Sequence, residues 1–590
     1  MEKWSVKNIK FDYENFSKHI GTSKIVTKLL VNRGIYTTNQ AKEYLDAKIE
    51  QMHPPTNMYG ILEGVELMKK SINEKERILI VGDYDVDGVI STLVLYKSLS
   101  KLGAKVTYHI PDRVTEGYGI NESIIKNAKK DNIDLIITCD NGIAAVEQIK
   151  LARELGIKVI ITDHHDVPFV EENKVKKHIL PNANVVINPK QEKCNYPFKN
   201  LCGAAVAYKF IEALFREYKI DKKEVEGLLQ YVAIATVCDV VDLIGENRII
   251  VKEGLKQINE TDNIGLKALL KVTGLEDKEV TVYALGFVIG PSINASGRLE
   301  QATWALKLFL SNNELEAKEL AEKLDDLNKE RQELTRLGLE EAIEKIESSN
   351  RHKDKVIVVY LPEVHESIAG IIAGRIREKY NLPAIVLTAA HEGAKGSGRS
   401  IDEYNLFEEM TKCKELLGKF GGHPLAAGMS IPTENIDLFR DKMNNICSLT
   451  DEDVMKKILI DMPMNISDIN YNLIDEISKL EPYGKGNSKP SFGVIGLRVK
   501  QARILGQNRN VLKLSLTDGR LNIDGVYFGD VEGFENIIKE HYGEIEYSKL
   551  MDGNNNNIKL DLVYVPTINE YMGRKSVQLL IQNYRINDLK

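Results

Sequence analysis

The fold and its chemistry are indicated first by the stretch Ile78-Leu79-Ile80-Val81-Gly82-Asp83-Tyr84-Asp85-Val86-Asp87-Gly88. Its apolar half predicts a β-strand, and its acidic half places Asp83, Asp85 and Asp87 within five positions at the end of that strand. If strand geometry continued that far, the two-residue period would aim all three carboxylates to one side. Carboxylates held together repel one another unless a cation or a donor compensates them. The stretch therefore predicts a metal site at a strand end.

Apolar runs of the same kind recur along residues 61–265, and helical patterns alternate with them. Continuous Ile- and Val-rich runs are typical of parallel strands that helices cover on both faces. The alternation predicts an α/β fold with a doubly wound, mostly parallel sheet, in which ligands bind outside the carboxyl ends of the strands. The predicted strands are Ile78–Asp83, Val106–Ile110, Leu135–Asp140, Val159–Thr162 and Val185–Asn188.

Two more of these strand ends carry metal-ligating residue types. One reads Thr138-Cys139-Asp140-Asn141-Gly142, and the other reads Thr162-Asp163-His164-His165. Carboxylates together with imidazoles suit Mn²⁺ or Mg²⁺ better than a thiolate-seeking metal. Asp239 closes an apolar helical stretch and is a further candidate, although a single acid at that position is more often a cap. The combined set predicts a metal-dependent enzyme.

The composition is that of a soluble globular protein with several domains. The chain has 590 residues, too many for one core, so three or four domains are expected. Its net charge of −7 argues against nonspecific binding of polyanions and leaves room for a local basic groove. The six cysteines form no C-x-x-C pair, which argues against a zinc ribbon. Because no apolar signal region or membrane span is visible, a cytoplasmic address is expected.

The remaining segments differ in pattern from the α/β region. Residues 1–60 are mixed and mainly helical, and residues 313–349 are charged and helix-prone, with a single glycine at Gly338. The latter predicts a long helix that bridges two domains or, equally, a surface helix packed along one domain. Residues 355–450 show a second α/β pattern with glycine-rich turns, and the alternation beyond residue 455 predicts a small β-barrel or sandwich.

These motifs resemble, in order, those of the DHH phosphoesterase superfamily. The matching segments are Asp85-Val86-Asp87-Gly88, Asp140-Asn141-Gly142, Asp163-His164-His165 and Asp239, and Gly421-Gly422-His423 is similar to the signature of the associated DHHA1 domain. More narrowly, segments 82–88, 289–299 and 480–487 resemble the RecJ family of single-stranded-DNA-specific exonucleases, and the similarity extends over nearly the whole chain. Val364-His365-Glu366 departs from the Trp-His that this family usually carries.

The resemblance implies a division into five parts. They are an N-terminal helical extension at residues 1–60, a DHH catalytic domain at 61–310, a long connecting helix at 311–352, a smaller α/β DHHA1 substrate-binding domain at 353–450 and an OB-fold-like, nucleic-acid-binding β-barrel at 455–590. In such a barrel, Tyr483 or Phe492 would be candidates for stacking on bases.

The resemblance also implies the metal ligands. Those of two Mn²⁺ or Mg²⁺ ions would be Asp83, Asp85, Asp87, Asp140, His164 and Asp239. Asp85 would serve one ion, and Asp140 would bridge both, because a carboxylate has two oxygens to share. The other ion would be held by Asp87, His164 and Asp239. Asp163 would orient an imidazole by a hydrogen bond, and His165 would face the scissile phosphate as an electrophile or proton donor.

Substrate contacts follow from the same resemblance. The arginines suit phosphate through their planar, two-pronged guanidinium groups, and those near glycine are expected to lie in glycine-rich turns. The expected positions, which would hold the terminal 5′-phosphate and the neighbouring backbone, are Arg113, Arg298, Ser397, Arg399 and His423.

The implied activity is 5′→3′ hydrolysis of phosphodiester bonds in single-stranded DNA by a two-metal mechanism, in DNA repair and recombination. One alternative is a short-oligonucleotide phosphodiesterase of the same superfamily, which would lack the β domain. The other is a non-catalytic DHH scaffold, in which lost ligands would be expected, whereas every ligand position is occupied here. The expected partners are single-stranded DNA, a helicase and a single-strand-binding protein, and the chain is expected to be a monomer without a membrane contact.

Overall fold

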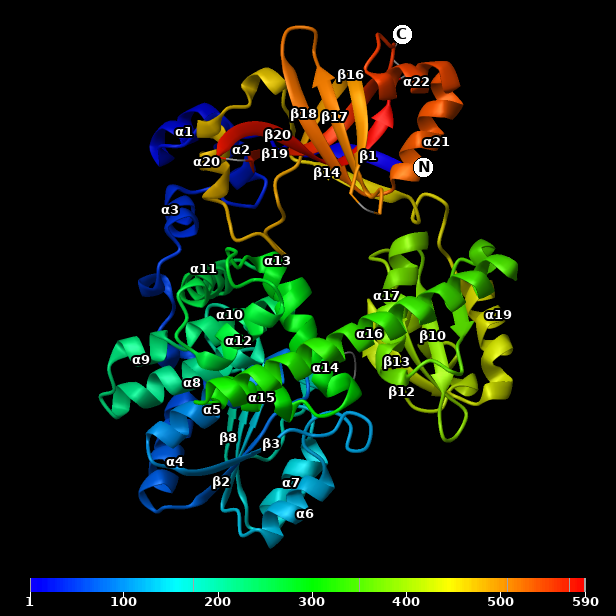
Figure 1. The fold of residues 1–590 in the computed structure, drawn as a ribbon. Helices are drawn as coiled ribbons and strands as arrows, with labels where there is room; N and C mark the ends of the chain where they lie inside the picture. The colour runs from blue at the N-terminus through cyan, green and yellow to red at the C-terminus, as the bar shows by residue number, and fades with distance from the viewer. Residues whose placement is uncertain (1, 173–174, 350, 507, 572, 588–590) are drawn as a thin grey trace. The chain divides into compact units, whose positions relative to one another are not determined.

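The chain folds into two compact units, one formed by Met1–Lys48 with Lys457–Lys590 and the other by Ile49–Lys456 (Figure 1). The structure is a computed structural model that describes residues 2–172, 175–349, 351–506, 508–571 and 573–587. Across these ranges, no helix has both the length and the apolar character needed to cross a bilayer.

A five-stranded sheet with the order β3-β2-β4-β5-β8 forms the centre of the larger unit. Every neighbouring pair is parallel, which confirms the doubly wound α/β prediction. Because all strands run the same way, their carboxyl ends share one edge, where the acidic motifs lie. The strands are β2 (Arg77–Val81), β3 (Lys105–His109), β4 (Leu135–Cys139), β5 (Lys158–Thr162) and β8 (Val185–Ile187).

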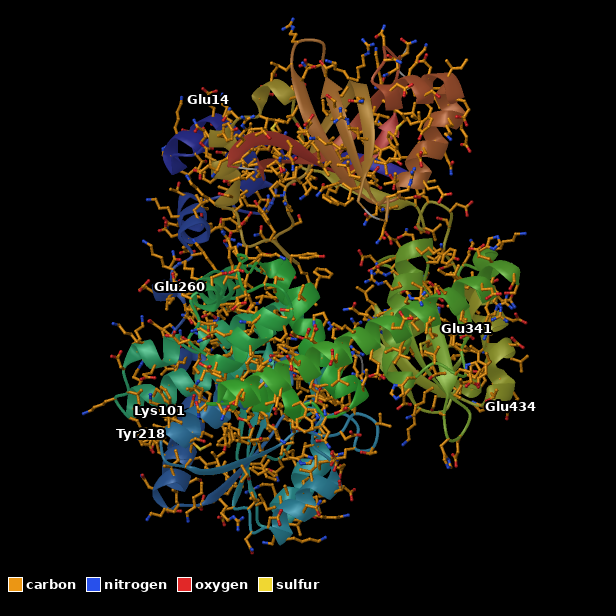
Figure 2. The ribbon with its side chains drawn as sticks, in the orientation of Figure 1. Glu14, Lys101, Tyr218, Glu260, Glu341 and Glu434 are labelled. Carbon is orange, nitrogen blue, oxygen red and sulfur yellow. The ribbon has the colours of Figure 1, made fainter. Side chains whose placement is uncertain are left out.

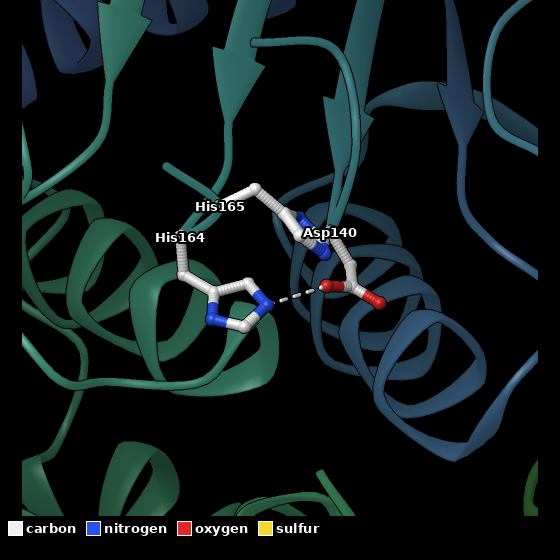
Figure 3. Close-up of side chains that lie close together, drawn as sticks. All are labelled: Asp140, His164 and His165. Atoms are coloured by element: carbon white, nitrogen blue, oxygen red, sulfur yellow. Dashed lines mark ion pairs between the residues drawn. The ribbon is translucent and has the colours of Figure 1, made fainter. Parts of the chain in front are cut away.

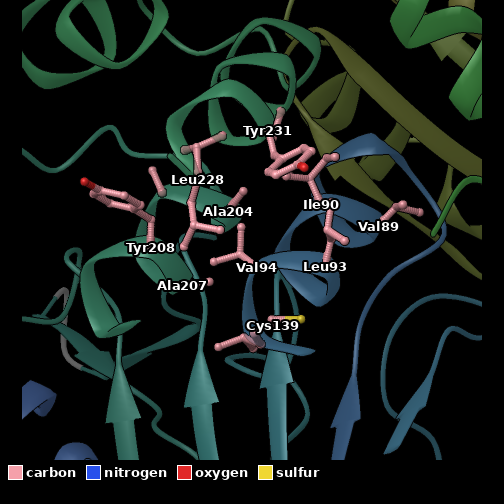
Figure 4. Packing of buried hydrophobic residues seen from close by; sticks show 14 of the residues in the cluster. Val89, Ile90, Leu93, Val94, Cys139, Ala204, Ala207, Tyr208, Leu228 and Tyr231 are labelled. Carbon is pink, nitrogen blue, oxygen red and sulfur yellow. The ribbon is translucent and has the colours of Figure 1, made fainter. Parts of the chain in front are cut away.

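Helices bury both faces of this sheet. Ile78 and Ile80 pack into the large core with α5 (Val86–Lys101), α8 (Gly203–Glu217) and α10 (Leu229–Cys238). Leu79 and Val81, one residue out of phase, pack with α6 (Glu122–Lys130) and α7 (Val146–Glu154). Figure 4 shows Val94 of α5 packed beside Ala204 of α8. Because side chains alternate along each strand, they contribute to two hydrophobic cores, one on each face of the sheet. The residues after the strand ends lie outside both cores.

Further helices of the same half of the larger unit surround these layers. They are α4 (Ile61–Asn73), α9 (Lys222–Glu226), α11 (Gly245–Asn259), α12 (Ile264–Val272), α13 (Val282–Ala284), the π-helix η3 (Leu285–Ile289), α14 (Gly290–Leu299) and α15 (Thr303–Leu310). Surface ion pairs link neighbouring helices, for example Lys101 of α5 with Glu224 of α9 at 2.7 Å (Figure 2 labels Lys101).

Helix α16 (Glu314–Ser348) runs for 35 residues and bridges the two halves of the larger unit. It contacts α12, α14 and α15 on one side and α17 (Ala369–Tyr380) on the other. A Cβ at Gly338 would lie 2.7 Å from Cδ1 of Ile372, so the single glycine of this helix allows α17 to approach closely. Of the two interpretations left open by the sequence, the bridging helix is therefore the observed one.

A second sheet has the order β12-β13-β11-β10-β9. Only β9 and β10 are parallel. The expectation that Ser397 and Arg399 lie in a turn is wrong, because they belong to strand β11, where a Cβ at Gly398 would lie 2.5 Å from Leu406. Here glycine makes room for packing. The elements are β9 (Ile357–Tyr360), β10 (Ala384–Ala389), β11 (Ala394–Arg399), β12 (Phe420–His423), β13 (Ala426–Ile431), α18 (Leu406–Thr411) and α19 (Ile436–Ile446).

The smaller unit contains the predicted barrel. Its strands follow the order β15-β16-β17-β18-β20-β19, and β16 also pairs with β19, which closes the sheet on itself. Helices α20 (Tyr471–Ser478), α21 (Val531–Tyr542) and α22 (Glu544–Asp552) accompany it. The strands are β15 (Met462–Pro463), β16 (Phe492–Leu505), β17 (Val511–Thr517), β18 (Asn522–Phe528), β19 (Lys559–Tyr571) and β20 (Arg574–Ile586).

The N-terminal residues are part of this smaller unit. Helices α1 (Tyr13–Ile20), α2 (Lys24–Val31) and α3 (Thr38–Asp46) share its core, but the chain begins with strand β1 (Glu2–Val6), which pairs with β14 (Lys456–Ile460). Phe492, a candidate for stacking on bases, is fully buried in the same core and cannot serve that purpose.

Candidate metal centre and anion site

The three acids after β2 are gathered by the start of a helix. Strand β2 ends at Val81, and Asp85 is the N-cap of α5. The Oδ1 atom of Asp85 accepts a hydrogen bond from the Gly88 backbone N at 3.0 Å. The expectation that strand geometry would align the acids is therefore wrong. A Cβ at Gly88 would lie 2.5 Å from the Asp83 backbone N, so glycine is needed where the helix folds back on the buried Asp83.

Asp140 lies at the centre of the site. It follows β4 in the left-handed backbone region, at φ 61°, and its side chain is buried. Its Oδ1 lies 3.1 Å from Nε2 of His164 (Figure 3), but that oxygen has no hydrogen-bond partner. A Cβ at residue 203 would lie 2.7 Å from the Asp140 Cβ, so Gly203 is required for α8 to start here.

Two distant helices complete the cluster. The carboxylate of Asp87 accepts hydrogen bonds from the backbone N of Gly203 (2.6 Å) and of Ala204 (2.8 Å), at the start of α8. Its Oδ2 also lies 3.7 Å from Nε2 of His164. Asp239, the C-cap of α10, places its Oδ2 3.7 Å from Nδ1 of the same imidazole. His164 thus contacts carboxylates from three different elements.

Among the described residues, three sets of side chains could each hold a metal ion. Within each set, the possible ligand atoms lie within 4.8 Å of one another. Asp140 belongs to two of them, as a bridging ligand would. The sets are Asp83, Asp85 and Asp140; Asp87, His164 and Asp239; and Asp140, His164 and His165.

The electrostatics of the cluster favour a cation. Burial and the charges of neighbouring aspartates raise the pKa of Asp83 and of Asp140 well above the ordinary range, and they raise the pKa of Asp239 to about 8. One buried oxygen of each of these three carboxylates has no hydrogen-bond partner. Burial lowers the pKa of His164, which leaves a neutral imidazole available as a ligand. The donor set fits Mn²⁺ or Mg²⁺, because divalent cations would satisfy the orphaned oxygens.

Asp163 braces the histidine loop. Its Oδ1 accepts hydrogen bonds from Nδ1 of His165 (2.8 Å) and from the backbone N of His164 (2.7 Å), and its Oδ2 accepts one from Ile143 N (2.9 Å). Burial of the His165 imidazole opposes protonation, but the hydrogen bond and charge of Asp163 prevail and raise the pKa of His165 to about 9. The raised pKa favours the imidazolium form of His165, which can donate a proton.

A group of arginines faces the same region without acidic partners. Arg298 Nη1 donates to the Ser367 backbone O at 2.6 Å, and Arg399 Nη1 donates to Ser397 Oγ at 3.1 Å. In the part of the chain that the structure describes, neither guanidinium has a carboxylate within 4.0 Å. Burial and the charges of Arg113 and other arginines lower the pKa of Arg298 to about 10. Cations that are buried together without acids form a receptor for an anion.

The first turn of α17 adds to this receptor. A Cβ at Gly370 would lie 2.8 Å from both Arg399 Nη2 and Ser397 Oγ, so the glycine lets these side chains lie directly against the helix. The amino-terminal end of a helix favours negative charge. The two remaining substrate candidates lie nearby. Arg113 stacks its guanidinium 4.8 Å from the centre of the Tyr84 ring. His423 is exposed on β12 and, like Arg399, lies opposite Ala426 in the sheet.

Helix α14 joins the metal cluster to the arginines. A Cβ at Gly297 would lie 2.3 Å from the Tyr84 backbone O, and Asn294 Oδ1 accepts a hydrogen bond from Val86 N at 3.2 Å. Arg298, the next residue after Gly297, lies in this helix, so its expected place in a turn is wrong. The sequence identified this segment by resemblance but gave no role to Asn294.

Two further contacts lay beyond the sequence patterns. Tyr118 donates from its hydroxyl to the Asp140 backbone O at 2.8 Å, and the same hydroxyl lies 3.3 Å from Nε2 of His165. Gly203 serves the site only through its missing side chain and its backbone N. Neither residue stands in a motif of metal-ligating types, so only the folded arrangement reveals them.

Comparison with known proteins agrees with this architecture. The sequence matches the DHH family, N-terminal domain, over residues 77–236, the DHHA1 domain over 353–449 and the RecJ OB domain over 460–583. The single-stranded-DNA-specific exonuclease RecJ of Bacillus subtilis is 36% identical over 591 residues, which cover 99% of this chain and 71% of that protein.

Two solved structures have the same fold. The crystal structure of RecJ in complex with Mn²⁺ from Thermus thermophilus superposes with a TM-score of 0.82 at 24% identity and covers 100% of this chain and 80% of that one. A structure of exonuclease RecJ bound to manganese is 30% identical, with a TM-score of 0.58 over 67% of this chain and 96% of that one. The chain therefore belongs to the RecJ family.

Proposed function

We propose that this chain is a single-stranded-DNA-specific exonuclease that removes nucleotides from the 5′ end with the aid of two Mn²⁺ or Mg²⁺ ions. Membership of the RecJ family supports the substrate, because the B. subtilis relative carries that activity in its name. The observation that carries the proposal is the pairing of a buried aspartate cluster with arginines that lack acidic partners, joined by α14. The aspartate cluster suits divalent cations, and the arginines suit the phosphate at the end of a DNA strand.

The residues of the chain would divide the reaction as follows. Arg298 and Arg399 hold the terminal 5′-phosphate, since guanidinium forks match its oxygens, and Arg113 and Ser397 add donors. Helix α14 fixes the spacing between that phosphate and the metal ligands, and so selects which phosphodiester is attacked. When bound between the aspartates and His164, divalent cations would supply positive charge that stabilises the attacked phosphate.

His165 would complete the chemistry. Water attacks the phosphorus, and the bond from phosphorus to the leaving oxygen breaks. His165, hydrogen-bonded to the scissile phosphate as an imidazolium, gives its proton to that oxygen. Asp163 keeps the imidazole charged and oriented through the 2.8 Å hydrogen bond to Nδ1. His423, exposed on β12, contacts the strand beyond the first nucleotides.

The whole chain fits this activity. We assign the catalytic domain to residues 61–310, the connecting helix to 311–352, the substrate-binding domain to 353–450 and the OB-fold to 455–590, with an N-terminal extension at 1–60. The enzyme acts as a monomer in the cytoplasm, in DNA repair and recombination, beside a helicase that unwinds its substrate and a single-strand-binding protein.

Digestion of 3′-labelled DNA tests the proposal. Single-stranded and double-stranded 30-mers and a dinucleotide are incubated with the wild-type chain and with Asp140→Asn, in Mn²⁺, in Mg²⁺ and in EDTA. The expected result is a ladder that shortens from the 5′ end, only with single strands, metal and the wild type. Preference for dinucleotides over 30-mers would instead indicate an oligonucleotide phosphodiesterase, and inertness under all conditions would indicate a scaffold.

A further inference from the structure

Tyr283 and Phe287 form an exposed, stacked aromatic pair. Their ring centres lie 4.8 Å apart with 23° between the ring planes. With 69% and 67% of their surface exposed, they are the two most exposed aromatic side chains in the described part of the chain. They stand at i and i+4 on one face, in α13 and η3, so the stack is a preformed feature of the surface. Two large rings held side by side in water offer a flat apolar surface on which another ring can stack.

The segment that carries the pair also borders the metal centre. The π-helix η3 packs on the end of α10, where Cys238 Sγ lies 3.6 Å from the Leu285 backbone O. The residue after Cys238 is Asp239, one of the candidate ligands. A π-helical turn of this kind is rare and occurs frequently at functional sites. Beyond η3 the chain enters α14, which leads to Arg298, so the rings belong to the same segment as the substrate site.

We propose that Tyr283 and Phe287 are a stacking platform for the unpaired bases of the strand being degraded. The inference rests on the proposed function. Every base of a single strand presents a π-face, so an aromatic platform holds DNA of any sequence. Bases within a duplex are already stacked on their neighbours and are not available to it. The platform therefore adds affinity beyond the first nucleotide and favours single strands.

The proposal is tested by removing the aromatic rings from the protein and single bases from the DNA, first separately and then together. The substrates are a 5′-phosphorylated (dT)20, the same strand with one abasic site moved through positions 2 to 8, and a 5′-phosphorylated dinucleotide. The proteins are the wild type, Tyr283→Ala/Phe287→Ala, the ring-retaining Tyr283→Phe/Phe287→Tyr and, as a matched control, Tyr59→Ala, which removes another exposed tyrosine (46% exposed).

The alanine pair should lower kcat/KM on (dT)20 by about 10- to 100-fold, the effect of losing one stacked base. It should leave the dinucleotide unaffected, and the other two variants should behave like the wild type. An abasic site at the stacking position should slow the wild type but not the alanine pair.

Several results would overturn the inference. These are unchanged kcat/KM on (dT)20, an abasic effect that persists in the alanine pair, or an equal loss on the dinucleotide, which would show that the rings support the fold. A wild type that cuts no single strand refutes the proposed function itself.

Discussion

Asp140→Asn should make the metal-free protein more stable than the wild type and the manganese-loaded protein less stable. The Asp140 side chain is buried, one of its oxygens has no hydrogen-bond partner, and the charges of Asp87, Asp85 and Asp83 repel it. Asparagine has nearly the same shape and tolerates the left-handed backbone at this position. The substitution therefore removes an unfavourable charge without leaving a cavity.

The magnitude follows from the cost of an uncompensated buried charge. Its removal should raise the free energy of unfolding by about 1–3 kcal/mol at pH 8 without metal. In the wild type, each cation present at 100 times its Kd should add about 2.7 kcal/mol. The variant should lose most of that gain, because Asp140 is expected to contribute to both ions. The order of stability should thus reverse when manganese is added.

Thermal unfolding of the wild type and of the variant, in EDTA and in MnCl₂, measures both terms. Asp262→Asn is a matched control, since its carboxylate is fully exposed, and it should shift neither curve appreciably. If Asp140→Asn were less stable than the wild type in EDTA, the charge cluster would not be strained as described. If manganese stabilised the variant as much as the wild type, Asp140 would not be a ligand.

Three further predictions concern pH and the substrate contacts. Because the pKa values of Asp239 and His165 are raised, the folded metal-free protein retains protons that the unfolded chain releases. Its stability should therefore fall from pH 6.5 to 8.5. A rise in the thermal unfolding midpoint over that range would contradict this. Asp163→Asn should lower the pKa of His165 and reduce kcat about 10- to 100-fold at pH 8, with partial recovery at lower pH; a parallel pH profile would assign Asp163 a purely structural part. Arg399→Lys should raise KM about tenfold for 5′-phosphorylated strands and hardly change it for 5′-hydroxyl strands; equal effects on both would place Arg399 away from the terminal phosphate.

The parallel sheet and the residue types of the metal site could be predicted from the sequence, because both depend on local patterns. The apolar runs end within one or two residues of the observed strands. The agreement is expected, since β2, β4 and β5 are buried on both faces, and an acid follows the end of each of these three runs. The alignment of Asp83, Asp85 and Asp87 by a strand period was wrong, because the Asp85 carboxylate caps α5 and starts a helix where a longer strand was expected.

What could not be predicted depends on contacts between distant residues. The glycines beside Arg298 and Arg399 suggested turns in the sequence. In the structure, Gly297 instead lets α14 approach Tyr84, and Gly398 lets strand β11 pack against Leu406. The start of α8 supports Asp87 from more than a hundred positions away, and strand β1 pairs with β14 near the other end of the chain. Nothing in the local sequence of α8 or of β1 indicates which distant residues they contact.

The central claim is that two divalent cations are held between these side chains. A crystal of the full chain soaked in MnCl₂, with data collected at the manganese absorption edge, tests it most directly. Two anomalous peaks are expected beside the Asp140 carboxylate, about 3.5–4 Å apart, one near Asp85 and the other near His164 and Asp239. A map without peaks at this position, or with manganese bound only elsewhere, would contradict the account.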